Sequence, residues 1–168
     1  MSSVQANTVP GTRLKPLNLL LPILLLLVLF GLSYGAAQHD SGIMDEPPNL
    51  VAGHYLWKTG HYNIDREHPP LARLIEALPL LFLPVEMAQS NPDGTMPPYW
   101  PLSVEFLYEN TVPAPRMLMP ARLMVMGLSV LLGAFLWWWG NQLFGPPAGV
   151  IALASRGAPP RSDRRPRG

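Results

Sequence analysis

The sequence has no cysteine and little charge. Without cysteine the chain can form no disulfide, no thiolate nucleophile and no cysteine metal site. Of its 168 residues only 14% are charged while 48% are hydrophobic, a balance typical of membrane proteins rather than of soluble domains. The chain also lacks GxGxxG, P-loop, GxSxG, HExxH and EF-hand patterns. Soluble nucleotide binding and serine hydrolysis therefore have no support.

Two long runs carry no charge at all. The first covers residues 17–37, and at about 1.5 Å per residue it reaches roughly the 30 Å of a bilayer core. The second covers residues 123–144 and is also long enough to cross. Trp137, Trp138 and Trp139 near its end fit an aromatic belt better than a sugar-binding platform. The sequence thus predicts an all-α membrane protein with two transmembrane helices.

The flanking charges predict the orientation of these two spans. Arg13 and Lys15 precede the first span, and arginines gather after the second, so the positive-inside rule places both termini in the cytoplasm. Residues 1–16 are then a cytoplasmic N-terminus, and residues 38–122 form a long external loop. A cleaved signal peptide ending near Gly35, Ala36 and Ala37 is the alternative for the first run, but the run is longer than the usual apolar region of a signal peptide.

The external loop is acidic, with ten acids and five bases between residues 38 and 122, and we expect two juxtamembrane helices in it. Residues 49–59 contain no proline and precede Gly60, which suits a helix C-cap. Residues 70–83 place apolar side chains on one face, with Arg73 and Glu76 on the opposite face. Pro79 interrupts this segment, which is too short to span. We interpret it as an amphipathic helix lying in the membrane interface.

The C-terminal part changes character twice. Residues 145–154 resume an apolar pattern, as though a third span were starting. Residues 155–168 are rich in arginine and proline and predict a disordered basic tail, able to touch anionic lipid headgroups. No nucleic-acid-binding fold accompanies these arginines, so we expect no nucleic-acid partner. The abrupt change suggests a fragment whose end is out of frame.

Asp45 and Glu46 form a carboxylate pair just outside the first span. Such a pair has two explanations. Acids favour the positive end of a helix macrodipole, and a helix is expected a few residues later. Alternatively, one carboxylate takes a proton from an attacking hydroxyl, a role that contributes about 10²- to 10⁴-fold in rate. The position immediately beyond a span favours the second explanation.

The four histidines do not predict a metal site. His54, His61 and His68 are spaced by seven residues, but Gly60 and the two prolines after His68 prevent the continuous helix that would align them. His68 differs from the others because the following proline restrains its backbone to an extended state. Rigid placement of this kind suits a contact with a phosphate or a sugar.

The run DEPPNLVAGHYLWKTGHYNIDREHPPLARLIEALPLL, starting at Asp45, resembles the first external loop of integral-membrane glycosyltransferases that use polyprenyl-phosphate sugars. This is the GT-C superfamily, which includes protein O-mannosyltransferases and lipid A aminoarabinose transferases. The matching elements are a first span, an Asp-Glu pair, a helix ending in glycine, a (His or Lys)-Pro-Pro-Leu motif and an apolar juxtamembrane helix. The similarity extends from about residue 17 to residue 154, through Ala121 and Arg122 to the run LFGPPAG.

The resemblance implies roles for five residues. Asp45 would be the general base that deprotonates the acceptor hydroxyl, and Glu46 would support acceptor or metal binding. The departing lipid phosphate needs preorganised cations or dipoles, for which His68, Arg66 and Arg73 are the nearby candidates. The donor substrate would be a polyprenyl-phosphate sugar, a divalent metal is left open, and the protein would lie in a bacterial cytoplasmic membrane.

Family members have further spans that complete the donor cavity, and this sequence shows only two. We therefore expect an N-terminal fragment of such an enzyme that is inactive alone. The alternative is a small two-pass membrane protein that acts as a non-catalytic interaction subunit, with an unknown protein partner.

Overall fold

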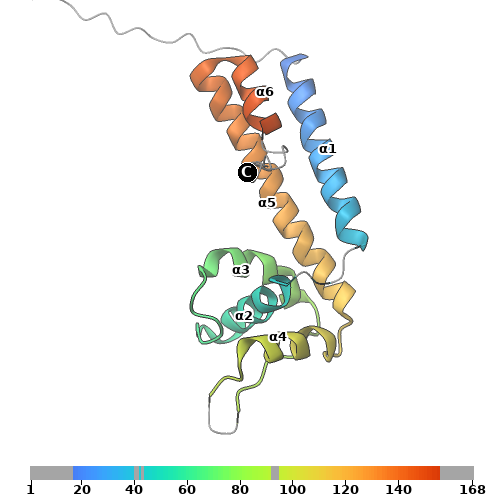
Figure 1. The fold of residues 1–168 in the computed structure, drawn as a ribbon, viewed down its shortest axis with the longest axis vertical. Helices are drawn as coiled ribbons and strands as arrows, with labels where there is room; N and C mark the ends of the chain where they lie inside the picture. The colour runs from blue at the N-terminus through green and yellow to red at the C-terminus, as the bar shows by residue number, and fades with distance from the viewer. Residues whose placement is uncertain (1–16, 40–41, 43, 92–94, 156–168) are drawn as a thin grey trace, which may run out of the picture. The chain divides into compact units, whose positions relative to one another are not determined.

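The computed structural model describes residues 17–39, 42, 44–91 and 95–155, and every element in these ranges is helical (Figure 1). Helix α1 (Leu17–His39) and helix α5 (Ala114–Phe144) are both long and apolar enough to span a membrane. The described part of the chain is thus all-α with two candidate membrane-spanning helices. The predicted cytoplasmic segment 1–16 and all but the first residue of the predicted tail lie outside the described residues.

Helix α5 begins earlier than the uncharged run, at Ala114 rather than at residue 123, and includes Arg116 and Arg122. Gly145, with φ 86°, separates it from α6 (Pro146–Ser155), which occupies the segment expected to start a third span. The two helices approach closely, since a Cβ on Gly149 would lie 2.6 Å from the carbonyl oxygen of Trp137. Only glycine permits this contact without a shift of the backbone.

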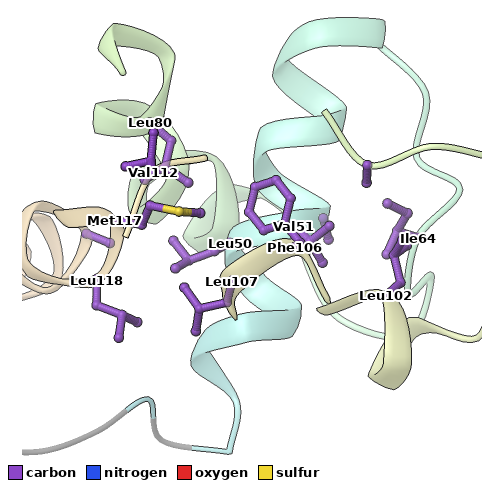
Figure 2. Close-up of a cluster of buried hydrophobic side chains, with 13 residues drawn as sticks. Leu50, Val51, Ile64, Leu80, Leu102, Phe106, Leu107, Val112, Met117 and Leu118 are labelled. Carbon is purple, nitrogen blue, oxygen red and sulfur yellow. The ribbon is translucent and has the colours of Figure 1, made fainter. Parts of the chain in front are cut away.

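Residues Leu29–Leu132 form one compact unit, built from the predicted external loop and the adjoining ends of both long helices. Its elements are α2 (Glu46–Thr59), α3 (Pro70–Ala77), the 3₁₀ helix η1 (Leu78–Phe82) and α4 (Tyr99–Tyr108). Figure 2 shows the core, in which Leu50 and Val51 of α2 meet Leu107 of α4 and Met117 of α5. All four side chains are fully buried. Each side chain of this size contributes about 1.5–3 kcal/mol on burial.

Two glycines determine how α2 ends and how it packs. Gly60 adopts φ 72°, and its N–H donates to the carbonyl of Leu56 at 2.9 Å, which ends the helix where the sequence places a C-cap. Gly53 faces α3 so closely that a Cβ there would lie 2.3 Å from the carbonyl oxygen of Arg73. Helices α2 and α3 therefore pack backbone against backbone at this point.

Helix α3 turns its polar side inward. Arg73 and Glu76 are 1% and 8% exposed, although the sequence pattern gives no sign that the polar face is buried. Leu71, on the apolar side, is 68% exposed, and Phe82 at the end of η1 is 84% exposed. Leu71 and Phe82 thus point away from the unit, whereas Arg73 and Glu76 face its interior together with Leu80 of η1, which is fully buried.

Candidate functional site

A cavity of about 460 Å³ opens beside the start of α2, and we call it the acid pocket. Its ionisable and amide lining comes from α2, α3, α5 and the residue preceding α2: Asp45, Glu46, Asn49, Glu76 and Arg122. Residues near the end of α1 and in the middle of α5 complete the wall. Three carboxyl groups and one guanidinium therefore meet in a hollow the size of a small ligand.

Glu46 is held by Arg122 through two hydrogen bonds. Arg122 donates from Nε to Oε1 and from Nη2 to Oε2, each at 2.8 Å. Its Nη1 donates to the carbonyl of Ala37 at 2.6 Å, where α1 nears its end. The side chain of Arg122 is 10% exposed and that of Glu46 is 17% exposed. This fork orients the Glu46 side chain, because bidentate pairing of this type is both strong and directional.

Asp45 stands at the N-cap of α2 but forms no side-chain cap hydrogen bond. The reason lies in the sequence. A cap accepts from the N–H groups two and three residues on, and here those residues are Pro47 and Pro48, which have no N–H. The side chain forms no hydrogen bond or ion pair with the described residues. The carboxylate is thus left at the pocket rather than used to cap the helix, although it still lies at the positive end of the helix.

Glu76 is the third carboxyl of the pocket and lies opposite α2. Burial and, after it, the nearby charge of Glu46 raise the pKa of Glu76 to about 7, against the weaker effects of Asn49 and Arg73. Asn49 lines the same pocket, and its Oδ1 accepts from Nε of Arg73 at 3.2 Å. This hydrogen bond orients the amide of Asn49, with its oxygen toward Arg73.

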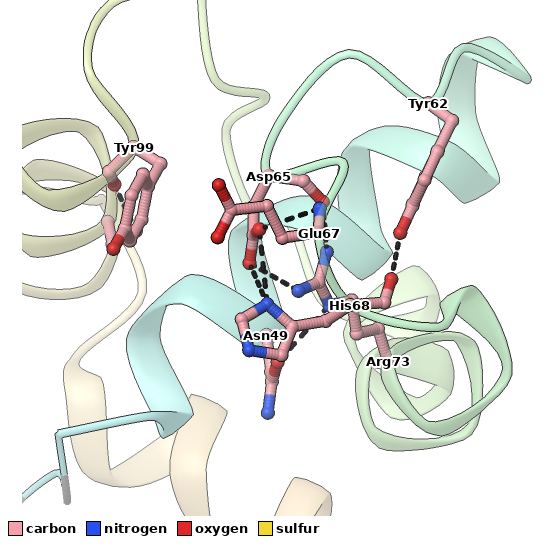
Figure 3. A network of polar contacts seen from close by, with 8 residues as sticks. Asn49, Tyr62, Asp65, Glu67, His68, Arg73 and Tyr99 are labelled. Carbon is pink, nitrogen blue, oxygen red and sulfur yellow. Dashed lines mark hydrogen bonds and ion pairs between the residues drawn. The ribbon is translucent and has the colours of Figure 1, made fainter.

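A second polar network lies around Asp65, between Arg73 and His68 (Figure 3). Arg73 forms an ion pair with the Asp65 carboxylate and donates to its backbone carbonyl at 2.7 Å. His68 Nδ1 lies 3.0 Å from Asp65 Oδ2. Burial acts to raise the pKa of Asp65, but the hydrogen bond from His68 and the charge of Arg73 outweigh it and hold that pKa below its usual value. The network also holds Asp65 at φ 49°, which is uncommon for a residue other than glycine.

The structure groups the predicted site residues differently from the sequence. Asp45 and Glu46 line the acid pocket, whereas Arg66, His68 and Arg73 do not. Arg73 is buried and holds Asp65, while Arg66 and the His68 ring are exposed. The residues predicted to bind the acceptor thus line the acid pocket, whereas those predicted to meet the phosphate lie outside it. Asn49 lines the pocket and also contacts Arg73, so it links the pocket to the network around Asp65.

Three members of the pocket were not predicted as site residues: Asn49, Glu76 and Arg122. The sequence did contain an indication for Arg122, because a cation at the edge of an uncharged run needs a partner there. The Pro-Pro pair after Glu46 was the signal that Asp45 does not cap a helix. Among the described residues, no group of three or more His, Asp or Glu side chains has the arrangement to hold a metal ion.

Comparison of the chain with protein-family models, with curated proteins and with solved structures finds no match.

Proposed function

We propose that this chain forms the acceptor-binding part of a membrane glycosyltransferase that uses a polyprenyl-phosphate sugar. The observation that carries the proposal is Asp45, a carboxylate left uncapped at a cavity beside a second carboxylate oriented by Arg122. A free base next to an ordered acid-guanidinium pair suits deprotonation of a bound hydroxyl. The resemblance of the Asp-Glu and His-Pro-Pro-Leu motifs to this enzyme class supplies the donor.

In the proposed reaction, Asp45 accepts the proton of the acceptor hydroxyl while the hydroxyl oxygen attacks the anomeric carbon of the sugar. The new C–O bond forms as the bond to the lipid phosphate breaks, and the phosphate leaves with the electron pair, which inverts the anomeric centre. Glu46 positions the acceptor and is itself positioned by Arg122. The exposed side chains of His68 and Arg66 are the groups proposed to meet the phosphate, with Arg73 and Asp65 orienting His68.

The proposed location is the outer face of a bacterial cytoplasmic membrane, with both termini in the cytoplasm. The exposed side chains of Leu71 and Phe82 support a unit resting on the lipid surface. Because the chain has no cysteine, a single Gln89→Cys substitution gives a clean topology probe at an exposed position. We expect a membrane-impermeant maleimide to label it in intact cells. Labelling only after lysis would contradict this orientation.

The test of the reaction is transfer of radiolabelled sugar from a polyprenyl-phosphate donor. It uses membranes that contain the full-length protein. Asp45→Asn should lower transfer at least about 100-fold, as loss of a general base does. Glu105→Gln, which neutralises an exposed acid on α4, is the matched control and should leave transfer unchanged. Equal transfer by wild type and Asp45→Asn would refute the proposal.

The second candidate function is a non-catalytic interaction subunit, and the exposed surface of α1 favours it. Only 6% of the apolar window of this helix is buried, so most of its surface is open to lipid or to a partner helix. Under this function, the chain in mild detergent would co-purify with a second membrane protein at fixed stoichiometry, and Asp45→Asn would leave the complex intact. Transfer activity that depends on Asp45 would exclude it.

A further inference from the structure

The acid pocket contains a carboxyl group that has no cation of its own. Glu76 is 8% exposed and lines the cavity, yet no described cation forms an ion pair with it. Arg73, three residues earlier on the same helix, pairs with Asp65. Arg122, across the pocket on α5, pairs with Glu46. Both nearby guanidinium groups are thus engaged with other carboxylates.

The groups that face Glu76 make an ionised side chain unfavourable there. Glu46 and Asp45 bring negative charge from the start of α2, and Asn49 of the same helix brings one neutral amide. A buried carboxylate beside a second carboxylate costs several kcal/mol unless it is paired, and such a group takes up a proton instead. The upward pKa shift of Glu76 agrees with this chemistry. Below about pH 7 the side chain is then mostly a carboxylic acid.

A carboxylic acid differs from the other two carboxyl groups of the pocket because it can donate a hydrogen bond. Asp45 and Glu46 act as acceptors when ionised. An alcohol oxygen both donates one hydrogen bond and accepts others, so it matches a pocket that offers carboxylate acceptors together with an O–H donor. A phosphate or carboxylate ligand would instead face two like charges.

We propose that Glu76 donates a hydrogen bond to a ligand in the acid pocket and completes there a binding site for a neutral alcohol or polyol. The inference rests on the proposed function and deepens it, because it names the chemical class of the acceptor and adds a binding residue on α3. Asn49, oriented by Arg73, lines the same pocket as Glu76.

The first experiment detects the proton itself. Infrared spectra of the full chain in lipid nanodiscs, recorded as a pH titration, should show a carboxylic acid C=O band that disappears around the pKa of about 7. Glu76→Gln should remove this band, and Glu105→Gln should leave it. Glu46→Gln should move the loss of the band to lower pH, because it removes a facing negative charge. Absence of a band assigned to Glu76 would overturn the proposal.

The second experiment measures ligand binding with methyl glucoside as a neutral polyol and glucose 1-phosphate as its anionic counterpart, by saturation-transfer NMR. Wild type should bind methyl glucoside about tenfold more tightly at about pH 5.5 than at about pH 8.5, and prefer it to the phosphate at both. Glu76→Gln, which keeps a neutral donor of similar size, should bind equally at the two pH values. Glu76→Leu should bind weakly at both, with an unchanged circular dichroism spectrum as the folding control.

Two results separate this inference from the proposed function. Polyol binding whose pH dependence persists in Glu76→Gln overturns the role of Glu76 and leaves the transfer assay with Asp45→Asn unaffected. A pocket that binds methyl glucoside with the expected pH dependence, while Asp45→Asn retains transfer, upholds the role of Glu76 and refutes Asp45 as the base. Preference for glucose 1-phosphate overturns the proposed ligand class.

Discussion

Arg122 of α5 donates a hydrogen bond to each carboxylate oxygen of Glu46 at 2.8 Å, although the two residues are 76 positions apart in the chain. The same guanidinium donates to the Ala37 carbonyl near the end of α1. One side chain therefore ties together the end of the first long helix, the start of α2 and the second long helix. An arginine rather than a lysine is needed for this arrangement, since only a planar fork can serve two carboxylate oxygens and a carbonyl at once.

Arg122→Lys should consequently be destabilising even though it keeps the charge. We expect a loss of about 1–3 kcal/mol in the free energy of unfolding, because the bidentate contact and the bond to Ala37 cannot both be replaced. Chemical unfolding in detergent micelles, followed by tryptophan fluorescence, measures the change. Arg116→Lys is the matched control, since Arg116 lies on the same helix but is exposed. Equal losses in the two variants would show that the fork contributes nothing specific.

Gly53→Ala should destabilise the unit although it adds only one methyl group. The new methyl group would lie 2.3 Å from the carbonyl oxygen of Arg73 and 2.7 Å from the Ala77 Cβ, so α2 and α3 must move apart. We expect a cost of about 1–3 kcal/mol, as for other overpacked interiors. Gly127→Ala in α5 is the control, because nothing lies within 4 Å of its added methyl group and alanine is the better helix former. A neutral Gly53→Ala variant would contradict the close packing of these helices.

The sequence indicated helices where a local cause exists, although α4 and the starts of α2 and α5 were not predicted. Uncharged runs of sufficient length indicate the two long helices, Gly60 indicates the end of α2, and Pro70 indicates the start of α3. The inward side of α3 was not predictable. Its pattern is amphipathic, but the pattern alone does not reveal that Arg73 and Glu76 face α2 rather than water. That burial depends on Gly53 and on partners distant in the chain.

The candidate site likewise contains residues that the sequence indicated and residues that it did not. The Asp-Glu pair attracts attention by its position after a span, and the structure places both side chains at one cavity. Asn49 and Glu76 join them only because α2 and α3 pack closely, a tertiary relationship with no local pattern. His68 appeared central because of the prolines behind it, but its ring contacts Asp65 outside the acid pocket.

Arg73→Met should be among the most destabilising single changes in the unit. It would leave Asp65, whose side chain is 6% exposed, without its cation, and breaking such a buried pair typically costs about 3–5 kcal/mol. Adding Asp65→Asn removes the stranded charge, so the double variant should recover part of the loss. The free energies of unfolding of the single and double variants in micelles measure the coupling between Arg73 and Asp65. Arg66→Met, at an exposed neighbouring position, should have little effect. A double variant less stable than Arg73→Met would contradict the assignment.

His54→Leu should change how stability depends on pH. The ring is 1% exposed, packs 5.5 Å from Phe106 between ring centroids, and has no partner for either nitrogen in the described part of the chain. Burial and, after it, the charge of Lys58 lower the pKa of His54 from 6.5 to about 4. Between these values the unfolded chain binds a proton that the folded protein does not, so stability falls as the pH drops through this window, by on the order of 3 kcal/mol.

Leucine removes this dependence and the cost of the unpaired nitrogens, so the variant should be at least as stable as wild type at neutral pH and clearly more stable near pH 4. Unfolding free energies across this range, with exposed His61→Gln as the control, provide the measurement. A variant that loses stability in parallel with wild type would show that another group is responsible for the acid sensitivity.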